Sequence, residues 1–264
     1  MNAITFSDRL AAAPIVPSKP ILSIDSLNVA FGDVVAIENL SLAVGCGEFV
    51  SLLGPSGCGK STILKALARL VQPTAGRITT PEADLRTGVM FQKPLLLPWR
   101  TTLDNVLLPV EIQRGGDVVD SADRKNALRM LDLVRLSDFC LAYPHQLSGG
   151  MQQRAALARA LMCDPDVLLL DEPFGALDEL TRDALNDELI RIWQSKETRL
   201  TTVVMVTHSI PEAVTMSDRV IVLSNRPARL VEDVPVAQTR PRAAEDVDVG
   251  AIIRRIRAMV RSGR

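Results

Sequence analysis

The stretch GPSGCGKS, at residues 54–61, constrains the possible fold more than any other part of the chain. It follows a short apolar run, EFVSLL (48–53), that is typical of a buried strand, and it opens a stretch with helical periodicity, STILKALARLV (61–71). Several later apolar runs predict strands that are buried on both faces of a parallel sheet. They are DVLLLD (166–171), TTVVMVTH (201–208) and RVIVL (219–223). The chain is therefore predicted to have an α/β fold.

The glycines and the lysine of GPSGCGKS have the spacing G-x-x-x-x-G-K-[ST]. Glycines let backbone N–H groups surround a phosphate, the lysine reaches the β- and γ-phosphate oxygens, and the hydroxyl can ligate Mg²⁺. We therefore predict a nucleotide site with Lys60 and Ser61 in these roles. A glycine-rich turn without a ligand is the alternative. Because Cys58 lies near Lys60 and a helix N-terminus, its thiolate is expected to be favoured.

The run VLLLDE (167–172) ends in two carboxylates, Asp171 and Glu172. Asp171 is expected to emerge where the strand ends, as a carboxylate that holds Mg²⁺ does. Glu172 is either a salt-bridge partner or a base that orients the attacking water, and its position alone does not distinguish these roles. This acidic strand downstream of the glycine-rich loop disfavours the turn without a ligand.

Two further polar residues follow predicted strands: His208 ends the run 201–208, and Gln92 follows TGVMF (87–91). Open α/β sheets bind ligands at the carboxyl ends of their strands, so both residues are candidates for the same site. A histidine in such a place is also often a satisfied structural residue. By position alone, both residues therefore remain ambiguous.

The stretch LSGGMQQR (147–154) places Ser148, Gly149 and Gly150 before a helical stretch, ALARALM (156–162). A helix N-terminus offers unpaired N–H groups and a partial positive charge, and glycines let a ligand approach the backbone closely. The stretch contains no acid, histidine or metal-ligand spacing. It therefore predicts a site for an anion.

Composition excludes several other classes of function. The 30 basic and 31 acidic residues give a net charge of −1, and aromatic residues make up 3% of the chain, so neither an electrostatic nor a base-stacking surface for nucleic acid is indicated. No apolar run has the length of a membrane span, and the N-terminus does not resemble a signal peptide. If the protein works at a membrane, another chain is expected to supply the spans. The cysteines show no C-x-x-C pair, which favours a reduced setting without zinc; they are Cys46, Cys58, Cys140 and Cys163.

These motifs together resemble those of the nucleotide-binding subunit of an ABC transporter, in the order of that family and over roughly residues 21–240. The motifs are GPSGCGKST (Walker A), FQ ending in Gln92 (Q-loop), LSGGMQQR (signature), VLLLDEP (Walker B), GALD at 175–178 (D-loop) and TH ending in His208 (switch histidine). The resemblance implies a P-loop NTPase (RecA-like) core with an antiparallel β subdomain and an inserted α-helical subdomain. It also implies an ATPase with ATP and Mg²⁺ as cofactors.

The resemblance further assigns the ambiguous residues. Glu172 becomes the catalytic base, His208 positions the γ-phosphate and water, and Gln92 senses Mg²⁺ and water. Phe31 matches the aromatic that stacks on adenine, although its alternation with Leu27 and Val29 would otherwise make it a core residue. The implied catalytic residues are Glu172, His208, Lys60 and Gln92. The implied ATP-binding residues are Phe31, Gly54, Pro55, Ser56, Gly57, Cys58, Gly59, Lys60, Ser61 and Thr62. The implied Mg²⁺ ligands are Ser61, Gln92 and Asp171.

The resemblance also implies a homodimer in which the signature of one chain clamps the ATP held by a second copy. The residues implied to act across the dimer are Leu147, Ser148, Gly149, Gly150, Met151 and Gln152, together with Asp178 of the D-loop. The cassette is expected to span 21–240 between a tail (1–20) and an extension (241–264). Its core and β subdomain are expected at about 21–92 and 162–224, and its helical subdomain at about 93–161.

The segment FQKPLLLPWRTTLDNV (91–106) is similar to that of nitrate/sulfonate/taurine-type importers. This similarity implies an integral membrane permease as partner, an indirect periplasmic binding protein and a peripheral location on the cytoplasmic face of the membrane. A soluble ABC ATPase of DNA repair or translation is an alternative, but the chain has neither a long coiled coil nor a second cassette. A non-catalytic scaffold is another, disfavoured by Glu172 and His208. The amphipathic stretch at 251–260 is expected to dock on its own domain rather than on lipid.

Overall fold

The computed structural model describes residues 15, 17, 19–81, 85–115, 119–195 and 197–262. The described residues form two compact units. The first unit contains those up to Gly45, those from Val50 to Pro81, and those from His208 onward. The second unit contains Cys46–Phe49 and the described residues that follow Pro81 as far as Thr207.

The first unit contains an antiparallel sheet of three strands in the order β2-β1-β4. The strands are β1 (Pro20–Phe31), β2 (Val34–Gly45) and β4 (Ala75–Thr79). Ile24 of β1 pairs with Leu42 on one side and Ile78 on the other. The antiparallel sheet that the resemblance implies is therefore present.

The first unit also contains β3 (Phe49–Leu53), which pairs in parallel with β8 (Arg219–Leu223), and β9 (Leu230–Pro235), which pairs antiparallel with β8. All five residues of β8 are buried. They include Arg219, whose guanidinium donates to both carboxylate oxygens of Asp233 in β9, at 3.1 and 2.5 Å. This buried ion pair explains why the polar segment after Arg226 returns to the sheet.

Two helices follow His208 and complete the first unit: α6 (Ile210–Met216) and α7 (Val247–Ser262). Val249, Ile253 and Ile256 of α7 are buried in one apolar cluster with residues of α6, β8 and β9, and Ile252, Met259 and Val260 are partly buried against the same cluster. The apolar face of α7 therefore packs on its own unit, as expected, and is covered from lipid.

The second unit is built on three parallel strands in the order β5-β6-β7. They are β5 (Thr87–Met90), β6 (Val167–Asp171) and β7 (Thr202–Thr207). Every residue of β6 and β7 is buried, which confirms the interpretation of their continuous apolar sequences. Helix α5 (Glu179–Gln194) connects β6 to β7 and buries Leu185, Leu189 and Ile192.

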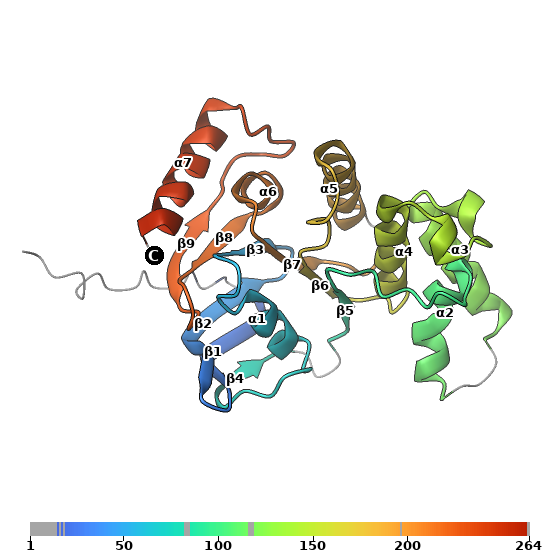
Figure 1. Cartoon of the computed structure of the whole chain (residues 1–264), viewed down its shortest axis with the longest axis horizontal. Coiled ribbons are helices and arrows are strands. Elements are labelled where there is room, and N and C mark those ends of the chain that lie inside the picture. The colour runs from blue at the N-terminus through green and yellow to red at the C-terminus, as the bar shows by residue number, and fades with distance from the viewer. Residues whose placement is uncertain are drawn as a thin grey trace, which may run out of the picture. The chain divides into compact units, whose positions relative to one another are not determined.

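Three further helices of the second unit pack on one another (Figure 1). They are α2 (Thr102–Gln113), α3 (Ser121–Leu133) and α4 (Gly149–Leu161). Each begins at a side-chain cap, because Thr101, Asp120 and Ser148 accept hydrogen bonds from N–H groups of the first turn. The inserted α-helical subdomain that the resemblance implies is therefore present.

Helix α1 (Lys60–Leu67) is shorter than the stretch 61–71 suggested. Ile63, Leu64 and Leu67 are buried as expected, but Leu70 is 60% exposed. The backbone reverses at Arg69, which has a φ of 59° and so cannot continue a right-handed helix. The helix predicted at 61–71 therefore ends at Leu67, earlier than its periodicity suggested.

Within the described part of the chain, no helix combines the length and apolar character needed to cross a bilayer.

Candidate nucleotide site

The glycine-rich loop lies in the first unit, between buried strand β3 and helix α1. Lys60 is the first residue of α1 and is 4% exposed, and its Nζ donates to the carbonyl oxygens of Gly54 and Pro55, both at 2.8 Å. Gly59 precedes it with a φ of 125°, and a Cβ at Gly59 would lie 2.7 Å from the Ala36 carbonyl oxygen. The loop is therefore tightly closed around its lysine, and only glycine fits at its last turn.

Ser61 and Thr62 lie in the first turn of α1 and are half-buried, and that turn contains no acidic residue. A helix N-terminus of this kind favours an anion. Cys58 is buried, and burial raises the pKa of its thiol, although the nearby Lys60 acts in the opposite direction. The expectation of a favoured thiolate at Cys58 was therefore wrong, because desolvation outweighs the neighbouring charge.

Two more candidate residues lie in the first unit. Phe31 ends β1 and is 54% exposed, which excludes the interpretation as a core residue and leaves its ring open to contact. His208 is also exposed and directly precedes Ser209, whose side chain accepts from the Glu212 N–H and caps α6. The imidazole is therefore accessible to a ligand.

The candidate acids lie at the carboxyl end of β6 in the second unit. Asp171 is the last residue of this strand and is 8% exposed. Glu172 follows it with a φ of 46°, and its N–H donates to the Val206 carbonyl at 2.9 Å. A left-handed conformation is uncommon for a glutamate and is characteristic of functional sites.

Gln92, which follows β5, reaches the same place. Its Nε2 donates to Oε2 of Glu172 at 3.3 Å, so the structure brings together two residues that lie 80 positions apart. Their positions after strands made both residues candidates, and the family resemblance implied their roles at the site. The amide and the carboxylate together can hold a water molecule between a donor and an acceptor.

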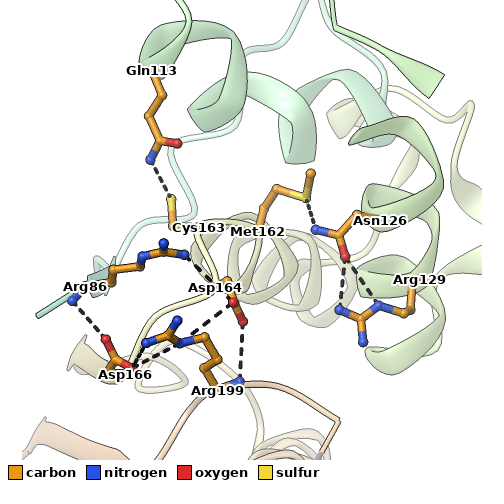
Figure 2. A network of polar contacts seen from close by, with 9 residues as sticks. All are labelled: Arg86, Gln113, Asn126, Arg129, Met162, Cys163, Asp164, Asp166 and Arg199. Atoms are coloured by element: carbon orange, nitrogen blue, oxygen red, sulfur yellow. Dashed lines mark hydrogen bonds and ion pairs between the residues drawn. The ribbon is translucent and has the colours of Figure 1, made fainter. Parts of the chain in front are cut away.

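The amino ends of these strands are fixed by a polar network that the sequence analysis missed (Figure 2). Asp166, just before β6, accepts from the Arg86 backbone N–H at 3.1 Å and from the Arg199 guanidinium at 3.1 Å. Asp164 accepts from the Arg199 N–H at 3.3 Å. Separated charges of this kind carry no local signal in a sequence. Their effect is to hold the segments before β5, β6 and β7 together, which positions the carboxyl ends that bear Gln92 and Asp171.

The LSGGMQQR stretch begins α4, as expected. Ser148 is the cap of this helix and accepts from the Met151 N–H at 3.3 Å, while Gly149 and Gly150 form its first turn. Ser148 and Gly149 are exposed, whereas Leu147 is buried. The helix mouth therefore presents its Ser-Gly-Gly outward and uses its leucine for packing.

The D-loop lies against this helix mouth. A Cβ on Gly149 would lie 3.3 Å from Cδ2 of Leu177, and one on Gly150 would lie 2.9 Å from Cγ2 of Thr181. Asp178 caps α5 by accepting from the Thr181 N–H at 3.0 Å, and this hydrogen bond lowers the pKa of its carboxyl. The structure thus brings the D-loop and the signature side by side within one chain.

Gln153 is a site residue that sequence reasoning missed. It is 3% exposed, and its Nε2 donates to the carbonyl oxygen of Gln92 at 3.0 Å. The signature helix therefore holds the backbone that carries the Q-loop glutamine. The one signal in the sequence was that Gln153 lies within the LSGGMQQR motif. Nothing in that motif shows that its side chain is buried.

Each unit offers an oxygen group of a kind that binds Mg²⁺. The described residues contain no cluster of three or more His, Cys, Asp or Glu side chains that could hold a metal by themselves. Mg²⁺ usually takes one or two protein oxygens and completes its shell with phosphate and water. The Ser61 hydroxyl and the Asp171 carboxylate are ligands of that kind.

Residues 37–175 match the ABC transporter family. An aliphatic sulfonates import ATP-binding protein of Mesorhizobium japonicum is 41% identical over 93% of this chain and 94% of its own. A nitrate import ATP-binding protein of Synechococcus elongatus is 42% identical over 82% of this chain and 80% of its own. A dimeric ATP-binding cassette, in a post-hydrolysis state with ADP and Pi, superposes with a TM-score of 0.70 at 32% identity, covering 83% of this chain and 100% of that one. The chain therefore belongs to the ABC transporter family, with the P-loop cassette fold and an ATPase activity coupled to transport.

Proposed function

We propose that this chain is the ATP-hydrolysing subunit of an importer for a small solute, and that two copies of it act together. The observation that carries the proposal is the arrangement at the end of β6, where Gln92 contacts a Glu172 held in a left-handed conformation beside Asp171. A strained carboxylate next to a metal-binding carboxylate suits a base that activates water. A non-catalytic scaffold does not require this arrangement.

In the proposed reaction, water attacks the γ-phosphate in line with the leaving ADP. Lys60 neutralises charge on the β- and γ-phosphates once it exchanges the carbonyls of Gly54 and Pro55 for phosphate oxygens. Glu172 accepts the proton of the water, Gln92 orients that water, and His208 donates to the γ-phosphate. Mg²⁺ would add positive charge at the phosphates, with Ser61, Gln92 and Asp171 as its proposed ligands. The rate enhancement comes mainly from charges fixed in advance.

The outward-facing Ser-Gly-Gly of α4 supports a site shared between two chains. An exposed helix N-terminus that begins with two glycines can accept a phosphate presented by another chain. In the proposed dimer, Ser148, Gly149 and Gly150 of one copy contact the γ-phosphate held by Lys60 of the other. Asp178 lies beside this contact.

Exposed apolar side chains on two adjoining segments of the second unit support a membrane permease as the third partner. The two segments are 95–103 and 139–143. They lie side by side, because the N–H groups of Thr102 and Leu103 donate to the Ala142 and Cys140 carbonyls. Apolar groups gathered on one surface mark interaction sites. The exposed apolar residues of these segments, each at least 40% exposed, are Leu95, Trp99, Phe139, Leu141 and Tyr143. Docking on a permease would place the chain at the cytoplasmic face of the membrane, with a solute-binding protein reached only indirectly.

The proposed solute is a small anion such as an aliphatic sulfonate, nitrate or a related compound. This proposal rests on the names of the two relatives and on the similar segment 91–106. The solute itself is expected to pass through the permease without touching this chain.

Purification of the tagged chain from its native membranes tests the proposal. We expect an integral membrane subunit to co-purify and the isolated chain to release phosphate from MgATP. Trp99→Asp should lose the membrane subunit and keep soluble ATPase activity, while Leu128→Asp, at an exposed leucine of α3, should lose neither. Recovery of DNA or ribosomes in place of a permease would support the alternative of a soluble ABC ATPase. Absence of phosphate release would contradict the proposed activity.

A further inference from the structure

Glu188 carries an unusually buried carboxylate. It lies on α5, and only 4% of its side chain is exposed, whereas its neighbour Asp187 is exposed. A buried carboxylate is costly unless a cation compensates it, and such residues are rarely placed on a helix for solubility. In the sequence, nothing distinguishes Glu188 from a residue on the solvated face of a helix.

The compensating cations come from two other elements of the second unit. Nε of Arg154 lies 3.1 Å from Oε2 of Glu188, and Nε of Arg135, just after α3, lies 3.6 Å from Oε1. Neither carboxylate oxygen has a partner in hydrogen-bond geometry, so the attraction is chiefly electrostatic. One turn further along α5, Arg191 donates to the Leu133 carbonyl at 2.6 Å. Burial raises the pKa of Glu188, and the three arginines oppose that rise.

The position of Arg154 gives this ion pair its interest. Arg154 is the last residue of LSGGMQQR and lies one helical turn after Gly150, whose Cβ position nearly touches Thr181. Thr181 and Glu188 are seven residues apart on α5, which is two turns of one helix face, or about 10 Å. The helices α4 and α5 are therefore joined at two points: a close contact at the D-loop and an ion pair two turns away.

We propose that Glu188 is a positioning residue that acts through Arg154. The ion pair holds the signature end of α4 against the D-loop end of α5, so that Ser148 and Asp178 meet the partner's nucleotide as one rigid element. This inference rests on the proposed dimer. Glu188 touches neither nucleotide nor water, and its effect is confined to the formation of the shared site.

The proposal predicts an effect on dimerisation and turnover without an effect on the first binding of ATP. Glu188→Gln keeps the shape of the side chain and removes the charge that attracts Arg154. Because the ion pair lies between α4 and α5 and the phosphate loop lies between β3 and α1, the Kd of the isolated subunit for ATP should be unchanged. The kcat should fall about tenfold with little change in KM, since the lost interaction matters only when the shared site forms.

The experiment compares Glu188→Gln with Asp187→Asn, which removes the same charge from the exposed neighbouring position. Each substitution is also combined with Glu172→Gln, which is expected to trap the dimer with ATP. The ATP-dependent dimerisation of these double variants is followed by light scattering. We expect Glu188→Gln to raise the ATP concentration needed for dimerisation about tenfold and Asp187→Asn to leave it unchanged. Thermal unfolding of each protein measures any loss of stability separately.

Arg154→Gln provides the second variant, and it carries the test if Glu188→Gln does not fold. Because both substitutions break one contact, Arg154→Gln should reproduce the effect, and the double variant should be no worse than either single one. Normal kcat and dimerisation in folded Glu188→Gln or Arg154→Gln, with only a lower Tm, would overturn the proposal. Additive effects of the two substitutions in the double variant would also overturn the proposal. If the unsubstituted chain with Glu172→Gln fails to dimerise with ATP, the proposed dimer fails instead.

Discussion

The phosphate loop of the first unit and the signature of the second unit are both glycine-rich turns at a helix N-terminus, but they are built differently. The phosphate loop buries its lysine, which is held by the Gly54 and Pro55 carbonyls. The signature exposes Ser148 and Gly149 and uses the Ser148 hydroxyl only to cap α4. One turn is closed on its own chain, and the other is open.

This difference indicates a division of labour. A closed loop with its charge already in place can bind a triphosphate within a single chain. An open helix mouth without a lysine is too weak an anion site to do so and becomes effective only against a phosphate that another chain presents. The two turns are thus interpreted as complementary halves of one site.

Glu172→Gln should have the largest effect and separates the two halves most clearly. The amide keeps its size but cannot accept the proton of water, so hydrolysis should fall about a hundredfold or more. ATP binding should be retained, because the phosphate loop is unchanged. Phosphate release and nucleotide titration measure the two properties, and light scattering should show a dimer trapped by ATP.

Near-normal turnover of Glu172→Gln would return this residue to the role of a salt-bridge partner. Glu179→Gln is a suitable control, because it makes the same change at an exposed position in the first turn of α5. It should leave hydrolysis close to normal.

Phe31→Ala should have a moderate effect and refines the account of the closed half. Its ring is 54% exposed, so truncation opens no cavity, and loss of one stacked base should cost about 1 to 3 kcal/mol of ATP binding. Titrations with ATP and with inorganic triphosphate provide the comparison. Equal weakening of both ligands would show that Phe31 supports the fold of the loop and does not contact adenine.

Alkylation of Cys58 tests whether the phosphate loop is closed. Burial raises the pKa of its thiol, and each unit of pKa above the working pH lowers the thiolate fraction about tenfold. Iodoacetamide at neutral pH should therefore modify the exposed Cys46 before Cys58. The rate of modification of Cys58 should continue to rise with pH beyond the pH at which an ordinary thiol is fully ionised. Peptide mass mapping over time measures both. Faster modification of Cys58 than of Cys46 would show that the loop is open in solution.

Much of the fold was predictable where the pattern of one segment determines its structure. The buried strands β6 and β7 were evident from continuous apolar runs. Strand β9 was not, because its residues are largely half-exposed and it depends on pairing with β8 and on the Arg219–Asp233 ion pair. A contact between distant residues leaves no periodic trace in either segment.

The same distinction applies to the site. Gln92 and Glu172 were candidates because both follow apolar strands, the family resemblance implied their roles, and the structure joins them. Cys58 was misjudged because a sequence shows its neighbouring lysine but not its desolvation. Glu188 was missed because the cation that makes it notable lies 34 residues away, on another helix.

The central claim, that the open signature acts on the phosphate loop of a second chain, is tested by combining two damaged copies. Lys60→Ala removes a phosphate contact, and Ser148→Arg blocks the helix mouth, so each homodimer should lose both sites. Ser148→Thr, which keeps the cap of α4, is the control and should remain active. A heterodimer of the two damaged chains would contain one doubly damaged site and one intact site.

The decisive measurement is nucleotide occlusion in that heterodimer, isolated with two different affinity tags. The account predicts recovery of about one occluded ATP per dimer, because the intact Lys60 of one chain meets the intact Ser148 of the other. If each chain instead completed its own site, every site would carry one lesion. No recovery of occlusion in a verified heterodimer would therefore contradict the shared site.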